Sequence, residues 1–253
     1  MVMHSKIAVV TGAARGMGLA IAAQLARDGL EVYGLDVLKE ELLQACTGLE
    51  RQNLRFHPLP LDLADELAIR SLPVRLGADF ADVCVLVNNA GISPKIDGKA
   101  PGVLGITLES WNTVMRINLT AALLIMQTCL PPMLRRGWGR IVNISSVGGK
   151  TTTGLAAASY TASKSGLLGL TRSVALEVSA QGITVNAVCP GRIETPMTGQ
   201  AVPETNAEQL KRIPVGRFGT PQEVADLVSF LASERSGYIT GAALDINGGL
   251  LMA

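Results

Sequence analysis

A hydroxyl, a phenol and an amine occur close together in the stretch from Ser145-Ser146 to Tyr160-Thr-Ala-Ser-Lys164. Tyr160 and Lys164 are four residues apart, so on a helix they share one face about one turn apart. An ammonium group stabilises a nearby phenolate, and we therefore expect Lys164 to lower the pKa of Tyr160. Such a phenol can give a proton to a carbonyl oxygen near neutral pH. Because Tyr-x-x-x-Lys also occurs by chance on many helices, the pair indicates this chemistry only if the chain also binds a hydride donor.

The elements that would position these groups follow an alternating pattern. Short apolar runs alternate with amphipathic segments, which predicts an α/β, Rossmann-type, doubly wound parallel sheet of about seven strands with helices on both faces. Strands are expected at 6–11, 31–36, 54–61, 83–87, 140–145, 183–188 and 243–246. Helices are expected at 19–27, 38–50, 64–76 (interrupted by Pro73), 111–136, 160–180 and 221–233. No repeat or low-complexity linker divides the chain, so a single domain over 1–253 is expected, with loops at 92–108 and 192–217.

Composition excludes several classes of protein. The chain has 253 residues, 48% hydrophobic and 17% charged, which suits a buried core, and its net charge of +1 marks no nucleic-acid or anionic-membrane surface. Cys46, Cys84, Cys129 and Cys189 are far apart, as expected for reduced thiols in a cytoplasmic protein. The two histidines are isolated, so no metal site is expected. The longest apolar stretch, 120–130, is too short to cross a bilayer, and no signal peptide is visible.

A glycine-rich turn, Gly12-Ala-Ala-Arg-Gly16-Met-Gly18, lies between the first strand and the first helix. Glycines let backbone amides approach a phosphate, and the helix N-terminus favours negative charge. Asp36 ends the second strand 18 residues beyond Gly18, where a carboxylate can accept hydrogen bonds from the adenosine ribose and repel a 2′-phosphate. An ordinary solvated strand end is the alternative, but the turn and the spacing together favour the ribose role. Asp62 and Asn88 also follow strands, so a ligand is expected at this edge of the sheet.

Six ordered motifs make essentially the whole chain resemble the short-chain dehydrogenase/reductase family. The motifs are Thr11-Gly-Ala-Ala-Arg-Gly-Met-Gly18, Asn88-Asn-Ala-Gly91, Asn118, Ser146, Tyr160-Thr-Ala-Ser-Lys164, and Pro190-Gly191 with Thr195. The resemblance implies an NAD(P)(H)-dependent oxidoreductase that interconverts a secondary alcohol and a ketone, and therefore a small-molecule substrate.

The resemblance also implies a catalytic role for four residues. Tyr160 would be the acid/base, and Lys164 would lower its pKa and bind the nicotinamide ribose. Ser146 would hold the substrate oxygen, and Asn118 would hold a water in a proton relay behind Lys164. The chemistry agrees, because two hydroxyl groups can stabilise the negative charge that grows on a carbonyl oxygen, and no metal is required.

The cofactor contacts implied by the resemblance lie at several strand ends. They are Gly12, Arg15, Gly16, Met17, Gly18, Asp36, Asp62, Leu63, Asn88, Ala90, Gly91, Tyr160, Lys164, Pro190, Gly191, Ile193 and Thr195. Arg15 occupies a position where related NADP-dependent acyl-carrier-protein reductases also carry Arg, whereas Asp36 would oppose a 2′-phosphate. Burying a carboxylate beside a phosphate costs more than a flexible Arg offsets, so NAD is expected, with NADP possible.

Two alternative functions stay open at this point. The chain is also similar to 3-oxoacyl-ACP reductase-like members, which suggests a 3-oxoacyl-ACP or CoA thioester reductase using NADPH. Lys211, Arg212 and Arg217 could then face an acidic carrier protein, although three basic residues also fit a solvated face. From another class, the same fold could serve a non-catalytic dinucleotide-sensing or scaffold protein, against which the presence of both Tyr160 and Lys164 argues.

Assembly and substrate depend on further segments. The resemblance implies a homotetramer built through the two long helices and the C-terminal strand. The pocket walls would come from 93–108, 148–155 and 197–212, the last of which lies within a substrate loop at about 192–217. These segments contain small and apolar residues, and their sequence does not identify the substrate.

Overall fold

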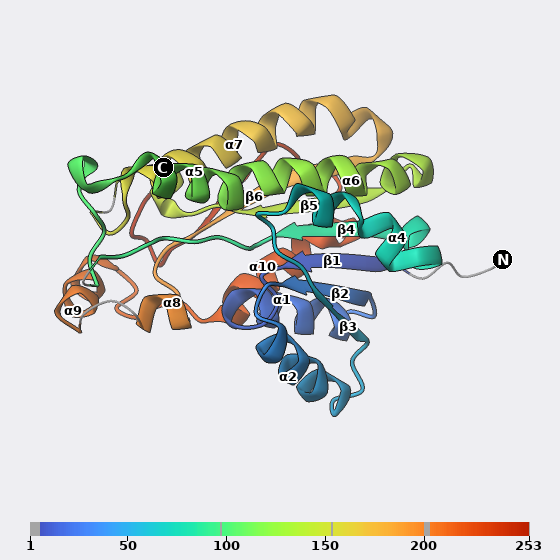
Figure 1. Ribbon diagram of the computed structural model, residues 1–253, viewed down its shortest axis with the longest axis horizontal. Helices are drawn as coiled ribbons and strands as arrows, with labels where there is room; N and C mark the ends of the chain where they lie inside the picture. Colours follow the sequence, from blue (N-terminus) through green and yellow to red (C-terminus); the bar gives the residue numbers. More distant parts are fainter. Residues whose placement is uncertain (1–5, 97, 153, 200–202, 253) are drawn as a thin grey trace.

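The protein is described by a computed structural model that covers residues 6–96, 98–152, 154–199 and 203–252 (Figure 1). In this part of the chain one parallel sheet of seven strands has the order β3-β2-β1-β4-β5-β6-β7, as the alternating pattern predicts. The strands are β1 (Ile7–Thr11), β2 (Glu31–Asp36), β3 (Phe56–Pro60), β4 (Val83–Asn88), β5 (Gly139–Ile144), β6 (Ile183–Pro190) and β7 (Ala243–Ile246). The predicted single doubly wound domain is confirmed.

Helices cover both faces of the sheet (Figure 1). On one face lie α1 (Gly16–Arg27), α2 (Lys39–Glu50) and α10 (Pro221–Ala232), with α1 packed along α10. On the other lie α3 (Glu66–Arg70), α4 (Leu72–Leu76), α5 (Leu108–Met115), α6 (Ala121–Arg136) and α7 (Ala158–Val178). Every residue of β1, β4, β5 and β6 is buried, because helices cover both sides of these central strands.

The carboxyl ends of the parallel strands meet at one edge of the sheet. Beyond that edge lie α8 (Pro196–Gly199), α9 (Pro203–Arg212) and the long connection after β4 (Figure 1). The expectation that 192–217 is irregular is therefore wrong. Pro196 and Pro203 each stand at the first position of a helix, where the missing N–H would have no partner in any case.

The segment 64–76 is broken at a different place from the one expected. Asp65 Oδ1 accepts from the backbone N–H groups of Leu67 and Ala68, at 2.9 and 3.1 Å, and so caps α3. The break falls at Ser71, whose hydroxyl donates to Ala68 O at 2.7 Å. Pro73 lies in the first turn of α4, so it helps to begin a helix rather than interrupting one.

The expected helix over 111–136 begins earlier and is not uniform. Thr107 caps α5 by accepting from Ser110 N at 3.1 Å, and a π-helical turn at Arg116–Thr120 joins α5 to α6. The stretch 120–130 is too short to cross a membrane, but it is part of the combined helix Leu108–Arg136, which is long and apolar enough to do so by length and composition alone. Its buried residues pack on β4 and β5, as in the core helix of a globular domain.

The connection 92–108 is mostly irregular, as expected. Ile96 and Lys99 form an isolated antiparallel bridge, and Val103–Gly105 is a single 3-10 turn. This connection leaves β4, extends beyond the edge where the strands end, and returns to α5 (Figure 1).

Candidate active site

Lys164 lies at the centre of the site, on the first turns of α7. It is 3% exposed, and its Nζ donates to Ile144 O, at the end of β5, at 2.7 Å. The same Nζ lies 5.8 Å from the centroid of the Tyr160 ring. Burial lowers the pKa of Lys164 to about 8, because charging an amine in a low-dielectric interior is costly. The amine is therefore held between the strand end and the phenol.

Tyr160 and Ser146 approach one another from α7 and from the end of β5. Ser146 Oγ accepts from Gly148 N at 3.0 Å, which fixes the short turn Val147–Gly149. Burial raises the pKa of Tyr160, and hydrogen bonding with the Ser146 hydroxyl lowers it. The expectation that Lys164 lowers the pKa of Tyr160 is not met in the protein alone. Desolvation of the phenol dominates, and the amine is engaged by Ile144 O.

Asn118 lies in the π turn and is 1% exposed. Its Nδ2 donates to Ile92 O at 3.0 Å and to Ser163 Oγ at 3.1 Å, while its Oδ1 accepts from Ile92 N at 2.8 Å. Ser163 Oγ donates in turn to Tyr160 O at 2.7 Å. The amide thus ties the chain leaving β4 to the helix that carries the phenol, and only one lone pair of Oδ1 remains for a water.

Gly91 allows the chain to pass between two of these side chains. A Cβ atom at this position would lie 3.2 Å from Lys164 Nζ and 3.3 Å from Asn118 Oδ1. The expected motif residues Gly91, Asn118 and Lys164 are therefore brought together.

The glycine-rich turn is closed by close backbone contacts. A Cβ atom on Gly18 would lie 1.9 Å from Gly12 O, so only glycine fits there. Asn89 Nδ2 donates to Thr11 O at 2.9 Å and to Gly12 O at 3.2 Å. Thr11 Oγ1 accepts from the backbone N–H groups of Asn89 and Ala90, both at 3.0 Å. Asn89 is a site residue that the sequence pattern did not single out, and its only signal was its place beside Asn88.

Asp36 is held in a fixed orientation at the end of β2. Its Oδ2 accepts from Ala14 N and its Oδ1 from Leu38 N, both at 3.0 Å. Each carboxylate oxygen keeps a lone pair for a further donor. Arg15 instead turns toward α2, where its Nη1 lies 3.2 Å from Glu41 Oε2 in an exposed ion pair.

The other expected cofactor residues occupy the ends of β3, β4 and β6. Asp62 is exposed and accepts from Ala64 N at 2.8 Å. Asn88 is 5% exposed; its Nδ2 donates to Asn143 Oδ1 at 2.8 Å, while its Oδ1 has no partner among the residues described. The Thr195 methyl group lies 3.5 Å from the position of a Cβ atom on Gly16, so the chain after β6 reaches the glycine-rich turn.

These features fit a dinucleotide. The glycine cradle would be filled by a Cβ atom, the Asp36 carboxylate is pre-oriented, and Asn88 offers a buried oxygen without a partner. Of the remaining expected residues, Met17 lies in the first turn of α1, and the others lie at or just after the ends of β3 and β6; they are Leu63, Pro190, Gly191 and Ile193. Among the residues that the structure describes, no group of three or more His, Cys, Asp or Glu could hold a metal ion.

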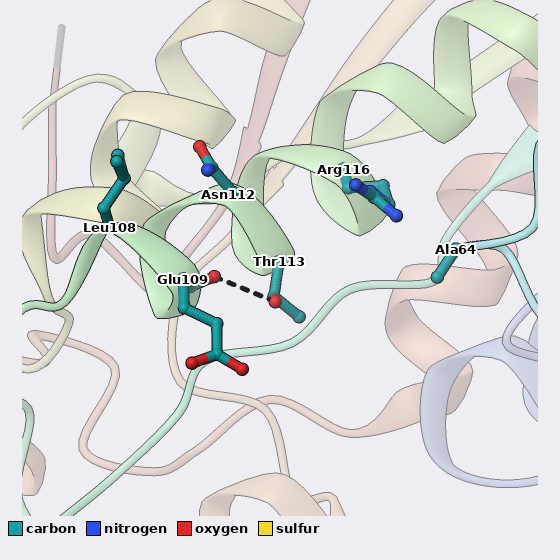
Figure 2. A pocket seen from close by; sticks show the side chains of 6 residues that line it. All are labelled: Ala64, Leu108, Glu109, Asn112, Thr113 and Arg116. Atoms are coloured by element: carbon teal, nitrogen blue, oxygen red, sulfur yellow. Dashed lines mark hydrogen bonds between the residues drawn. The ribbon is translucent and has the colours of Figure 1, made fainter.

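A hollow of about 470 Å³ lies between α5 and the segment that carries Ala64 (Figure 2). Its lining residues are Ala64, Leu108, Glu109, Asn112, Thr113 and Arg116. None of the four expected catalytic residues lines it.

A doubly wound sheet with a glycine-rich first turn, a fixed acid after β2 and a Tyr–Lys helix defines a dinucleotide-dependent oxidoreductase. A family model described as "Enoyl-(Acyl carrier protein) reductase" matches residues 12–251. The chain is 39% identical over 249 residues to the 3-oxoacyl-(acyl-carrier-protein) reductase FabG of Escherichia coli (strain K12), covering 98% of each chain. The protein belongs to the short-chain dehydrogenase/reductase family.

Two solved structures resemble the chain over nearly its whole length. One is a 3-oxoacyl-(acyl-carrier protein) reductase with bound NAD from Brucella melitensis, with a TM-score of 0.91, 37% identity, and coverage of 99% of this chain and 93% of that chain. The other is a putative NAD(P)-dependent gluconate 5-dehydrogenase from Beutenbergia cavernae with bound NADP, with a TM-score of 0.90, 34% identity, and coverage of 98% and 97%. The protein is thus an enzyme acting on CH–OH donors with NAD or NADP, rather than a non-catalytic scaffold.

Proposed function

We propose that the enzyme interconverts a secondary alcohol and a ketone with NAD(H), and that Tyr160 is its acid/base. The observation that carries this proposal is the convergence of the Tyr160 phenol, the Ser146 hydroxyl and the Lys164 amine at the strand edge that also holds the glycine-rich turn. When bound, the nicotinamide supplies or accepts the hydride.

In the direction of reduction, the Ser146 and Tyr160 hydroxyls donate hydrogen bonds to the substrate carbonyl oxygen, on which negative charge develops. Tyr160 then gives its proton to that oxygen, and oxidation follows the same path backwards. The Ser146 hydroxyl offsets part of the pKa increase that burial imposes on Tyr160. Lys164 holds its position beside the phenol, and Asn118 positions the chain after β4 against α7.

The preference for NAD over NADP rests on the orientation of Asp36. Both carboxylate oxygens are fixed by backbone N–H groups, so the carboxylate can accept from ribose hydroxyls but cannot easily turn away from a 2′-phosphate. Arg15 is paired with Glu41, which reduces its availability to a 2′-phosphate.

Tyr160→Phe tests the central role. The variant removes the proton donor and leaves the ring in place, so kcat is expected to fall by about 10²–10⁴-fold. NADH binding, measured by fluorescence titration, is expected to change less than twofold. Ser165→Ala is the control, because this exposed hydroxyl on the same helix donates only to Gly149 O, at 2.8 Å. Retention of wild-type turnover by Tyr160→Phe would refute the assignment.

Reduction of a 3-oxoacyl thioester is the second candidate, favoured by the identity to 3-oxoacyl-(acyl-carrier-protein) reductases. The basic cluster expected to meet a carrier protein is weakened, because Arg217 forms an ion pair with Glu223 at 2.6 Å. Rates with 3-oxoacyl-CoA and with simple ketones, each with NADH and NADPH, separate the two candidates. A higher kcat/KM for the thioester with NADPH would favour the thioester reductase.

We also propose a homotetramer in the cytoplasm, without a nucleic-acid or membrane partner. Leu176 on α7 is 87% exposed and Leu134 on α6 is 43% exposed, which leaves apolar surface on the two long helices for a second copy. All four cysteines are free and buried, which suits a reducing compartment. Light scattering is expected to give four times the chain mass of 26.5 kDa, and a monomer would contradict the assembly.

A further inference from the structure

Two cationic side chains lie beside the site without a role in the chemistry proposed above. We propose that Lys95 and Arg192 bind an oxyanion group of the substrate, so that the enzyme acts on a hydroxy or oxo acid rather than on a neutral alcohol or ketone. The inference deepens the proposed function and rests on it.

Lys95 bridges the chain after β4 and the chain after β5. The backbone N–H and C=O of Ile92, three residues earlier, are both hydrogen-bonded to the Asn118 side chain. The chain that carries Lys95 therefore starts next to Asn118, one of the proposed catalytic residues. Its Nζ donates to Leu155 O, in the connection between Ser146 and Tyr160. Lys95 therefore contacts the connection that joins Ser146 to Tyr160, the two residues that would hold the substrate oxygen.

Arg192 enters the same region from β6. It follows Pro190-Gly191 and precedes Thr195, which reaches the glycine-rich turn. Its Nη2 donates to Asn206 Oδ1 and Thr198 O, and its guanidinium carbon lies 6.0 Å from the Phe218 ring centroid. Its Nε is buried and has no hydrogen-bond partner among the residues that the structure describes. Such a donor carries a desolvation cost that a ligand acceptor would remove.

Lys95 and Arg192 repel one another electrostatically, and no described carboxylate neutralises either charge. The charge of Arg192 is one cause, after burial, of the lowered pKa of Lys95, and burial lowers the pKa of Arg192 itself. Neither side chain takes part in an ion pair with a described Asp or Glu. Two partly buried like charges without a counterion among the described residues are unfavourable, so an anion bound between them would be stabilising.

The donor geometry favours a planar oxyanion. A guanidinium presents its N–H groups as a rigid fork that matches a carboxylate, and a nearby ammonium adds a point charge. A phosphate on an acyl carrier offers the same oxygen acceptors. We therefore assign a carboxylate on a small substrate, and the experiment includes the phosphate as a separate arm.

The test compares matched acid and amide substrates in the intact enzyme. For each oxo acid that is reduced, kcat/KM is expected to exceed that of its amide by about tenfold or more. Arg192→Gln and Lys95→Met are each expected to lower this ratio by about tenfold, mainly through KM of the acid. The amide and NADH are expected to keep their wild-type kcat/KM and Kd. Arg192→Lys, which retains the charge, is expected to restore part of the ratio.

Lys99→Met is the matched control, because Lys99 lies on the same connection but its side chain is exposed and its contact with Ile96 is through the backbone. An equal fall for acid and amide in Arg192→Gln would show that Arg192 only holds the chain around α8 and α9, and would overturn the inference. A higher kcat/KM for an acyl phosphopantetheine thioester than for its pantetheine analogue and for every free acid would assign the oxyanion to phosphate and overturn the carboxylate.

A binding arm separates this inference from the proposed function. Malonate is expected to raise the melting temperature of the NADH-bound wild type, and Arg192→Gln is expected to lose that increase. If no ketone or alcohol is turned over but malonate stabilises only proteins with Arg192, the proposed function fails and the anion site stands. An absence of malonate stabilisation in the wild type would overturn the site.

Discussion

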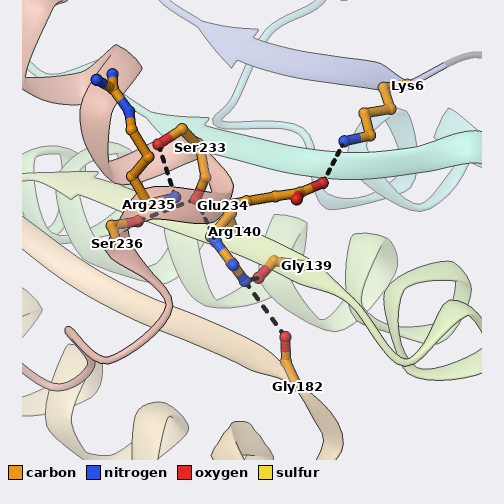
Figure 3. Close-up of polar contacts among 8 residues, drawn as sticks. All are labelled: Lys6, Gly139, Arg140, Gly182, Ser233, Glu234, Arg235 and Ser236. Atoms are coloured by element: carbon orange, nitrogen blue, oxygen red, sulfur yellow. Dashed lines mark hydrogen bonds and ion pairs between the residues drawn. The ribbon is translucent and has the colours of Figure 1, made fainter.

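The two ends of the sheet place an arginine in different surroundings, since Arg140 is buried at the amino end and Arg192 is partly buried at the carboxyl end. At the amino end, Arg140 is 4% exposed and its guanidinium donates to the carbonyl groups of Ser233, Gly139 and Gly182 at 3.0, 2.8 and 3.3 Å (Figure 3). At the carboxyl end, Arg192 keeps an Nε without a described partner. A cation whose donors are satisfied by the fold serves stability, whereas one with a spare donor is available for a ligand.

The amino end is closed further by charge and by an aromatic ring. Lys6 pairs with Glu234 at 3.1 Å (Figure 3), and both Lys6 and Arg140 lie over the Trp138 ring, at 4.9 and 4.4 Å. Burial lowers the pKa of Arg140, and the charge of Glu234 counteracts part of that decrease. At the carboxyl end, burial lowers the pKa of Lys95, and the like charge of Arg192 lowers it further. Changes at the amino end should therefore affect stability, and changes at the carboxyl end should affect turnover or cofactor choice.

The largest effect expected from this contrast comes from Arg140→Met. The variant leaves three carbonyl groups without their donor, and the free energy of unfolding is expected to fall by about 3 kcal/mol. kcat of the folded protein should stay within twofold of the wild type. Urea unfolding and steady-state kinetics measure the two quantities. Arg55→Met is the control, since this exposed guanidinium donates to one carbonyl, Gly29 O, and should cost less than about 1 kcal/mol. A loss of kcat without a loss of stability in Arg140→Met would break the contrast.

The next effect concerns the dependence of stability on pH at Lys164. Its pKa of about 8 in the folded protein lies below the ordinary value of 10.5, so between these pH values the unfolded chain binds more protons. The contribution of Lys164 to stability should therefore increase as pH rises from 8 to 10.5. Relative to Lys164→Met, the wild type is expected to gain on the order of 1–3 kcal/mol over this range.

Urea unfolding of both proteins at pH 7.5 and 10.5 measures this difference. Lys99→Met provides the comparison, because the side chain of Lys99 is exposed. If the difference in the free energy of unfolding between the wild type and Lys164→Met is the same at both pH values, burial does not disfavour the charged form of Lys164, and the prediction is wrong.

The smallest effect is expected at Asp36. Asp36→Ala removes the carboxylate that would repel a 2′-phosphate, so the ratio of kcat/KM for NADH over NADPH should fall by about tenfold. Glu41→Gln, which releases Arg15 from its ion pair, should lower the ratio further in the double variant. An unchanged ratio, together with a lower melting temperature, would show that Asp36 only anchors the turn through Ala14 N and Leu38 N.

The strand edge was predictable from the sequence because each central strand is a short buried run that is followed by a polar or glycine residue. The same pattern could not predict that Pro196 and Pro203 begin helices, since a proline both breaks a helix and suits its first turn. The spacing of Tyr160 and Lys164 places a charge near the phenol and therefore predicts a lowered pKa. Desolvation raises this pKa instead, and its extent depends on the finished packing. Asn89 and Lys95 gain their importance from contacts with the distant residues Thr11 and Leu155, which local spacing does not predict.

The π turn at Arg116–Thr120 has a consequence for the helical phase of α5 and α6. Each residue of an α-helix turns the chain by about 100°, so one extra residue in a π turn rotates the following helix by that angle. The buried face of α6 is therefore rotated relative to the buried face of α5. Deleting one residue from this turn would restore a regular helix but would rotate one of the two segments out of phase with its neighbours. Asn118 and the buried stripe of α6 could then no longer both face inward. The π turn therefore lets one continuous helix direct both Asn118 and the buried residues of α6 toward the interior.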